Sequence, residues 1–176
     1  MKILFILAFL ISFAVILVPL RAQEQLRYEV HPQMLWEEKE VEALGDHITN
    51  YTLKENKNIV MNFSFFDQDL SKEIKEKSVD EVVKQLIKGK EIIYSMMGAN
   101  NQKVLEKKLT TENGVQVLNV KGQYEIGAIT YFLNEKYYIV PQKVLLTSLR
   151  FTNKEAKEKY LEGAIKDYEN IKIKAK

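Results

Sequence analysis

KVLEKKLTTENGVQVLNV, residues 103–120, is the stretch that decides the predicted fold of this chain. Two β-rich runs, Lys103–Thr111 and Val115–Val120, flank the triplet Glu112–Gly114. Asn-Gly between β-rich runs is the strongest short-range hairpin signal, because both residues accept the positive φ angles of a tight turn. Since a hairpin joins antiparallel neighbours, this stretch predicts a mainly antiparallel sheet.

The residues after this hairpin predict three more strands, at Tyr124–Leu133, Tyr137–Val140 and Val144–Phe151. Asn134-Glu135 is predicted to turn between the first two of them. Pro141 has no N–H to donate to a neighbouring strand, so it predicts a sheet edge, a bulge or a short loop before the last one.

A second hairpin is predicted upstream, from the β-rich runs His47–Leu53 and Ile59–Phe66 and the polar turn Glu55–Asn58 between them. Side chains alternate between the two faces of a strand. One face of the second run is entirely large and apolar and is predicted to point to the core: Ile59, Met61, Phe63 and Phe65.

Two helices are predicted from capping boxes, in which a Ser or Thr and a Glu three residues later satisfy free N–H groups of the first turn. Ser78 and Glu81 open the first helix, which Gly98 ends, and Thr152 and Glu155 open the second, which ends near Asn170. Apolar residues recur at helical spacing in both. The chain therefore predicts an α+β fold, with about six to seven mostly antiparallel strands packed against two main helices.

The N-terminal segment Met1–Ala22 has the layout of a secretory signal peptide. Lys2 supplies the positive start, Ile3–Val18 is sixteen uncharged and mostly apolar residues, and Ala22 is a small residue for cleavage after Pro19. The apolar run is shorter than the about 20 residues of a spanning helix. We predict a signal peptide at 1–22 and an exported protein, periplasmic or extracellular. The alternative is an uncleaved helix that anchors the domain to the membrane.

Residues 23–176 are then predicted to form a single α+β domain of ordinary size. Lys2 and Arg21 are two of the 26 basic residues, so the remaining 24 balance the 24 acidic residues. A neutral domain lacks the positive field on which nucleic-acid binding depends, so we predict no nucleic-acid partner. The chain has no cysteine, which excludes thiol catalysis and thiolate metal sites and fits a bacterial exported protein.

Several features follow one another along residues 23–176: the segment from His31-Pro32 to Trp36, a hairpin, the helix from Ser78, Glu112–Val115, a long hairpin that ends in Glu135–Val140, and a capped C-terminal helix. Together they resemble the PsbP-like fold of the photosystem II extrinsic protein, the Ran-binding Mog protein and bacterial periplasmic proteins of the DcrB type. Asn170-Ile171-Lys172 departs from the Ser-Phe pair on which family members commonly close. The resemblance implies an α/β/α sandwich without shared catalytic residues, and a binding, assembly or chaperone-like role.

No motif predicts a catalytic, metal or cofactor site. His31 and His47 lie on separate predicted elements without the spacing of a zinc site. The run Asp67–Glu73 alternates like the start of a calcium loop, but Lys72 and Ser78 stand where such a loop needs Gly and Glu. We interpret this run as a solvated link from strand to helix. No residue is therefore assigned a catalytic, metal or cofactor role.

Tyrosines concentrate in the late strands, and four of them are the candidate partner surface: Tyr124, Tyr131, Tyr137 and Tyr138. Tyrosine suits interfaces because one end of its ring is apolar and the other is polar. It also simply favours strands, so strand filling is the alternative explanation.

The leading hypothesis is an exported bacterial protein, not an enzyme, that binds a protein partner or helps to assemble a complex at the cell envelope. One alternative is a small-ligand-binding protein or hydrolase with a site in a sheet–helix cleft. That alternative requires a pocket lined by two or more converging polar or ionisable groups. Another is a secreted effector that acts on a host. A membrane is a partner only if the N-terminal segment stays uncleaved.

Overall fold

Seven strands form one antiparallel sheet in the order β2-β3-β4-β8-β7-β6-β5. This computed structural model describes residues 26–43, 46–96, 98–155 and 159–175. The predicted signal peptide at 1–22 lies outside the described residues. The strands are β2 (Trp36–Ala43), β3 (Asp46–Leu53), β4 (Val60–Phe66), β5 (Ala99–Glu112), β6 (Val115–Ile126), β7 (Ile129–Val140) and β8 (Lys143–Thr152).

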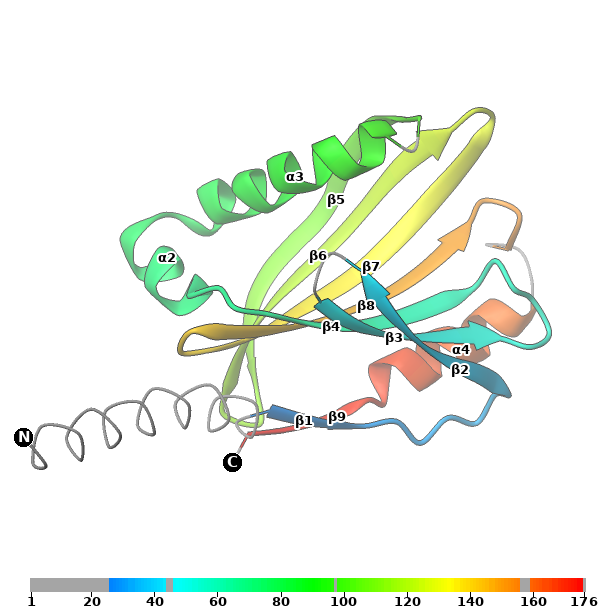
Figure 1. The fold of residues 1–176 in the computed structure, drawn as a ribbon, viewed down its shortest axis with the longest axis horizontal. Helices are drawn as coiled ribbons and strands as arrows, with labels where there is room; N and C mark the ends of the chain where they lie inside the picture. Colours follow the sequence, from blue (N-terminus) through cyan, green and yellow to red (C-terminus); the bar gives the residue numbers. More distant parts are fainter. Residues whose placement is uncertain (1–25, 44–45, 97, 156–158, 176) are drawn as a thin grey trace, which may run out of the picture.

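Helices cover both faces of the sheet (Figure 1). Helices α2 (Leu70–Glu76) and α3 (Val79–Met96) lie on one face, and α4 (Lys159–Glu169) lies on the other. A second sheet has two strands, β1 (Leu26–Glu29) and β9 (Lys172–Ala175), and lies on the same side of the large sheet as α4. The predicted α+β sandwich is confirmed. None of the described helices combines the length and the apolar character that a membrane span requires.

The hairpin between β5 and β6 forms as predicted. Asn113 and Gly114 both take positive φ angles, 51° and 81°. Their strands pair from Glu112 opposite Val115 back to Ala99 opposite Ile126. The local signal was sufficient here because the turn needs only two residues that tolerate the left-handed region.

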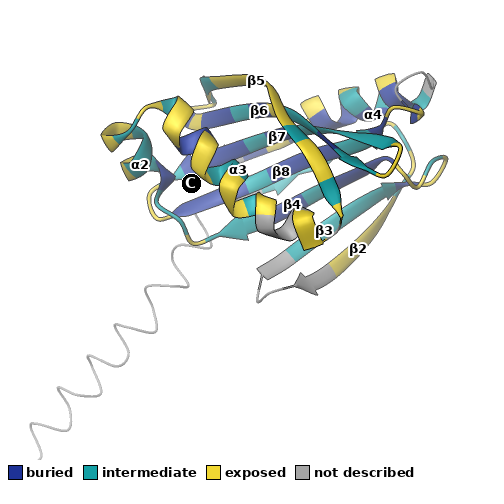
Figure 2. Cartoon of the chain, turned by 90° about the horizontal axis from the view of Figure 1, so that it is seen from above, coloured by how far each residue is buried: buried dark blue, intermediate teal, exposed yellow. Residues whose placement is uncertain are grey.

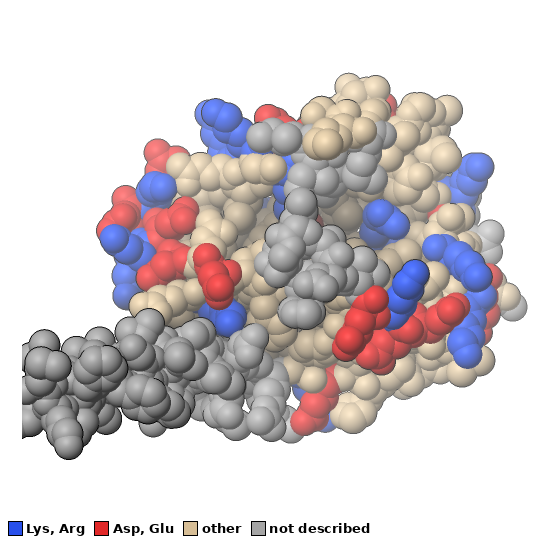
Figure 3. Space-filling view, in the orientation of Figure 1, with Lys and Arg blue, Asp and Glu red and all other residues tan. Residues whose placement is uncertain are grey.

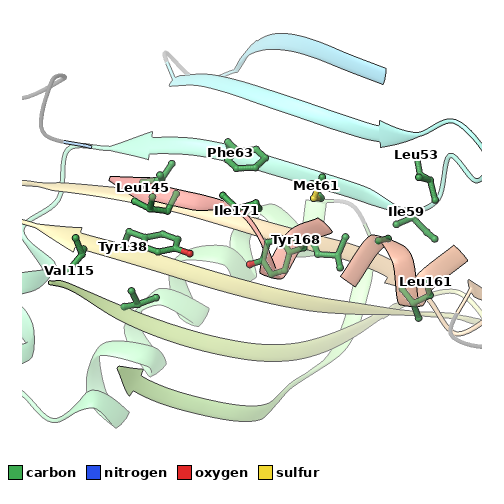
Figure 4. Close-up of a cluster of buried hydrophobic side chains, with 14 residues drawn as sticks. Leu53, Ile59, Met61, Phe63, Val115, Tyr138, Leu145, Leu161, Tyr168 and Ile171 are labelled. Atoms are coloured by element: carbon green, nitrogen blue, oxygen red, sulfur yellow. The ribbon is translucent and has the colours of Figure 1, made fainter. Parts of the chain in front are cut away.

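The core on the α4 side contains the face of β4 that the alternation predicts (Figure 4). Ile59, Met61 and Phe63 are 0–1% exposed and pack in one cluster with Leu161 and Tyr168. Fully burying a side chain of this size contributes about 1.5–3 kcal/mol. This layer therefore holds α4 and the small sheet against the large one.

A second core lies under α2 and α3, which pass over the other face of the sheet (Figure 2). It is formed by Leu70, Val82, Val83, Leu118, Val120, Tyr137, Ile139 and Val144. The Ser78–Glu81 capping box is present, since Ser78 Oγ accepts from Glu81 N–H at 3.2 Å and Glu81 Oε2 accepts from Ser78 N–H at 3.0 Å. Gly98, at φ 74°, follows the helix as predicted.

The predicted turn at Asn134-Glu135 is wrong. Both residues lie inside β7, where Asn134 pairs with Lys121 and Glu135 pairs with Val120. The turn falls instead after β6, where Gly127 takes a φ of 59°. At the other end of β7, Pro141 and Gln142 make a short loop, which is one of the three outcomes that the proline predicts.

Three elements were not predicted as such. The run interpreted as a solvated link overlaps α2, which begins because Asp69 accepts from Lys72 N–H at 3.0 Å and Leu70 is fully buried. The polar stretch Gln23–Gln33 contains β1, and β2 begins at Trp36. Strand β2 is an edge whose residues 37–40 are charged and exposed, a composition that blunts sheet edges but obscures the strand pattern.

Candidate functional site

A cleft of about 250 Å³ lies between α3 and the strands β5, β6 and β7. Its apolar lining comes from Val83, Leu86 and Ile87 of α3 and from Val104, Val120 and Leu133 of the sheet. Gln102, Lys103 and Gln123 add polar groups, and Lys90, Glu135, Tyr124, Tyr137 and Gly122 complete it. The cleft is thus mainly apolar with a few converging polar groups, which is the usual character of a binding site for a small molecule.

Two local features of the sheet keep this cleft open. Gly122 pairs with Leu133 and lines the cleft without a side chain to fill it. A Cβ atom at that position would lie 3.2 Å from the Lys103 carbonyl oxygen. Beside it, the pairing of β5 shifts between Val104 and Glu106. Such an irregularity bends an edge strand and re-aims its side chains.

Lys90, Glu135 and Tyr137 form a polar cluster against the apolar lining. Lys90 Nζ lies 2.5 Å and 2.6 Å from the two carboxylate oxygens of Glu135 and 2.5 Å from the Tyr137 hydroxyl. Tyr137 also donates to Glu135 Oε2 at 3.1 Å. Glu135 and Tyr137 share a face because they alternate along β7, and α3 brings Lys90 to them.

This cluster is largely shielded from water, since the side chains of Lys90 and Glu135 are 23% and 9% exposed. The Lys90 ammonium also lies 5.2 Å from the centre of the Tyr137 ring. The three contacts of Lys90 Nζ all go to oxygen atoms of Glu135 and Tyr137, which match the three donors of a lysine side chain. The cluster is therefore suited to fixing α3 over β7 and to orienting a ligand.

Arg150 of β8 is a further polar residue, which lies next to the cleft without lining it. Its guanidinium carbon lies 5.9 Å from the centre of the Tyr131 ring, which stacks on Tyr124 at 5.0 Å. Burial raises the pKa of Tyr124, and the positive charge of Arg150 offsets part of that rise. The Nε atom of Arg150 is buried and has no hydrogen-bond partner among the described residues.

The four tyrosines predicted as a partner surface are placed differently. Tyr124, Tyr137 and Tyr138 are 1%, 3% and 2% exposed, so they do not form an exposed surface, and only Tyr131 is half-buried. Burial also raises the pKa of Tyr138, which belongs to the α4-side core. The correction has a simple cause: strands covered on both faces bury side chains of both parities. Tyr124 and Tyr137 line the cleft instead.

The two histidines and the acidic run give no converging ligand set in the part of the chain that the structure describes. His31 is exposed, and its Nε2 atom lies 3.6 Å from Glu29 Oε2. The side chain of His47 is outside the described residues. Asp69 caps α2 through Lys72 N–H and Ser71 Oγ. These hydrogen bonds lower its pKa, as expected for a carboxylate that caps a helix.

Charged residues of both signs are interspersed over the face shown in Figure 3. Several pairs lie on the surface, such as Lys121 with Glu106 at 2.7 Å and Lys107 with Asp80 at 3.0 Å. This distribution matches the near-neutral composition of residues 23–176 and gives that face no extended basic stripe.

The chain is similar in structure to cyanobacterial PsbP (CyanoP) from Synechocystis sp. PCC 6803, with a TM-score of 0.59 over 86% of this chain and 94% of that chain. The fold is PsbP-like. Protein PA94 from Pseudomonas aeruginosa, described as a putative regulator of unknown function, matches at a TM-score of 0.43 and 14% identity over 77% of this chain and 80% of that one. No protein-family model matches the sequence, and no curated protein matches it.

The resemblance predicted from the sequence is confirmed at the level of the fold. Sequence identity to CyanoP is 8%, so the likeness extends to the PsbP-like fold and not to side chains. Lys90, Glu135 and Arg150 were not singled out by the sequence. The available signal was Glu135, an acidic residue between Leu133 and Tyr137 on one face of an apolar strand. The incorrect prediction of a turn at Asn134-Glu135 concealed this signal.

Proposed function

We propose that this chain is an exported, non-enzymatic binding domain whose recognition site is the cleft beneath α3. The observation that carries the proposal is the Lys90–Glu135–Tyr137 cluster set into an otherwise apolar cleft. Such a combination favours a small amphipathic ligand, because the apolar lining supplies affinity and the few polar groups fix orientation. Export rests on the signal-like segment at 1–22.

The proposal is tested with 1-octanol, a neutral amphiphile, added to the purified protein and followed by amide chemical shifts. We expect saturable shifts at Val83, Val120 and Leu133, which line the cleft. Leu133→Trp fills the cleft and should abolish them. Leu35→Trp is the matched control, because Leu35 is 63% exposed and does not line the cleft. Shifts that do not saturate, or that survive Leu133→Trp, would overturn the proposal.

A protein partner at the cell envelope is a second candidate, favoured by a different observation. Edge strand β5 carries Leu105 and Val104, which are 56% and 37% exposed. Exposed apolar side chains on a sheet edge suit a partner that adds a strand there. The irregular pairing and the lysines of β5 work against such addition, so the cleft ranks first.

The two candidate sites, the cleft and the β5 edge, are distinguished by which variant loses a partner in a pull-down from envelope extract. A β5 partner would bind saturably, would be lost with Leu105→Lys and would be retained with Leu133→Trp. Retention with Leu105→Lys would rule out this edge as the partner site.

A further inference from the structure

Arg150 lies next to the cleft on the same face of the sheet. It pairs with Leu133, which lines the cleft, and two residues before it Ser148 pairs with Glu135. Because side chains two residues apart point to the same face, Arg150 and Ser148 project toward α3, as do Leu133 and Glu135. The stacked Tyr131 and Tyr124 rings connect Arg150 to the cleft, since Tyr124 is part of the lining.

The positive charge of Arg150 is not balanced by a carboxylate in the part of the chain that the structure describes. The nearest carboxylate on this face of β7 is Glu135, and both of its oxygens are engaged by Lys90. Glu135 is therefore already paired and does not balance the charge of Arg150. A guanidinium offers five N–H donors, and a buried Nε without an acceptor is costly unless something else supplies one.

The geometry of Arg150 also suits a planar anion. The guanidinium carbon lies 5.9 Å from the centre of the Tyr131 ring in a cation–π contact, and the group also hydrogen-bonds the Tyr124 side chain. These two contacts restrain the guanidinium, while its buried Nε still lacks an acceptor. An oriented guanidinium binds a carboxylate through two parallel N–H···O bonds. One unbalanced positive charge calls for a monoanion. The cleft of about 250 Å³ is small, so it suits a short- or medium-chain apolar body.

Resting on the proposed function of the cleft, we infer that its ligand is a short- to medium-chain monocarboxylic acid. The apolar chain lies between α3 and the sheet, and the carboxylate binds the Arg150 guanidinium. Lys90 and Glu135 then serve as the fixed, mutually neutralised side of the site, and Arg150 selects the charged head group.

The test compares octanoate with 1-octanol on the full-length protein, by isothermal calorimetry and amide chemical shifts. Wild-type protein should bind octanoate at least tenfold more tightly than 1-octanol, since a charge-assisted bidentate contact is worth at least that factor. Arg150→Gln should remove this preference and leave 1-octanol affinity within about twofold. Retained 1-octanol binding also shows that the variant is folded. Lys103→Gln is the comparison variant, because Lys103 is an exposed cation of the cleft lining that could bind the head group in place of Arg150.

The outcomes separate this inference from the function on which it rests. Equal affinity for octanoate and 1-octanol in wild-type protein would overturn the carboxylate assignment and leave the binding cleft intact. Loss of the preference for octanoate in Lys103→Gln but not in Arg150→Gln would show that the carboxylate binds at Lys103, and would overturn the role of Arg150. Tighter binding of octyl phosphate than of octanoate would overturn the inference that the ligand is a monoanion. Absence of binding by both octanoate and 1-octanol would refute the proposed function itself.

Discussion

The indole N–H of Trp36 donates to Asp167 Oδ2 at 2.9 Å, joining the start of β2 to α4 across 131 positions of sequence. The same carboxylate accepts from the backbone N–H groups of Gln33 and Met34 at 2.8 Å and 2.9 Å. Asp167 is 3% exposed. Three donors from residues 33–36 thus converge on one buried acid of the last helix.

Asp167→Ala should destabilise the protein by about 3 kcal/mol, because it leaves three partly buried N–H groups without an acceptor. That loss corresponds to a fall in Tm of about 6–12 °C for a domain of this size. Calorimetry checks it. Glu162→Ala, on the exposed side of the same helix, is the control and should leave Tm nearly unchanged. A fall of less than about 2 °C in Asp167→Ala would contradict the structural role of this carboxylate.

Glu135→Leu should destabilise the protein by about 3 kcal/mol, because it leaves the Lys90 ammonium buried without its carboxylate. The double variant Lys90→Met/Glu135→Leu should recover most of that loss, since an apolar pair needs no charge partner. Urea denaturation of the single and double variants measures the coupling. Purely additive losses would mean that the two side chains do not interact. Glu106→Leu breaks an exposed pair and should give no measurable change.

Stability should fall in acid partly through Glu155. Burial raises the pKa of this carboxyl group, but hydrogen bonds from Thr152, Asn58 and Asn56 prevail and hold the pKa below its ordinary value. A group with a lowered folded-state pKa stabilises the protein above its unfolded-state pKa, and that stabilisation is lost as pH falls through the folded-state pKa. Wild-type protein should therefore lose more stability below about pH 4.5 than Glu155→Gln does. Parallel stability–pH curves would exclude Glu155 as the source.

Two glycines should respond to alanine in opposite directions. Gly89 lies inside α3, and no atom lies within 4 Å of the place that a Cβ atom would take. Gly89→Ala should therefore stabilise the protein by about 0.5–1 kcal/mol. Gly114 has a φ of 81° in the β5–β6 turn, so Gly114→Ala should destabilise by about 1 kcal/mol or more. Thermal unfolding of the two variants side by side checks both signs. Stabilisation by Gly114→Ala would contradict the turn geometry.

The exported protein should begin at Gln23. Intact-mass analysis of the protein isolated after expression with its own N-terminus measures this directly. Cleavage after Ala22 is expected because that small residue follows the apolar run and the helix-breaking Pro19. A mass that begins at Met1 would instead indicate an uncleaved membrane anchor.

Elements with a local cause were predictable. The Asn113-Gly114 turn, the Ser78–Glu81 cap and the alternation of Ile59, Met61 and Phe63 each depend on residues a few positions apart. The Asn134-Glu135 turn failed because Asn is common in turns but tolerated in strands, and Gly127 offered a better turn seven positions earlier. Strand β2 was missed because its charged residues conceal the alternation that marks a strand.

The sequence by itself determined the antiparallel hairpin architecture and the capped helix that follows Ser78, because each is encoded by neighbours along the chain. The predicted cap at Thr152 and Glu155 is wrong, since Thr152 ends β8 and α4 begins at Lys159. Only the tertiary structure decided the site. Lys90 and Glu135 are 45 positions apart and meet because α3 crosses β7, and Arg150 joins them only through the pairing of β8 with β7. Contacts between distant residues depend on strand register and helix placement, which no local pattern specifies.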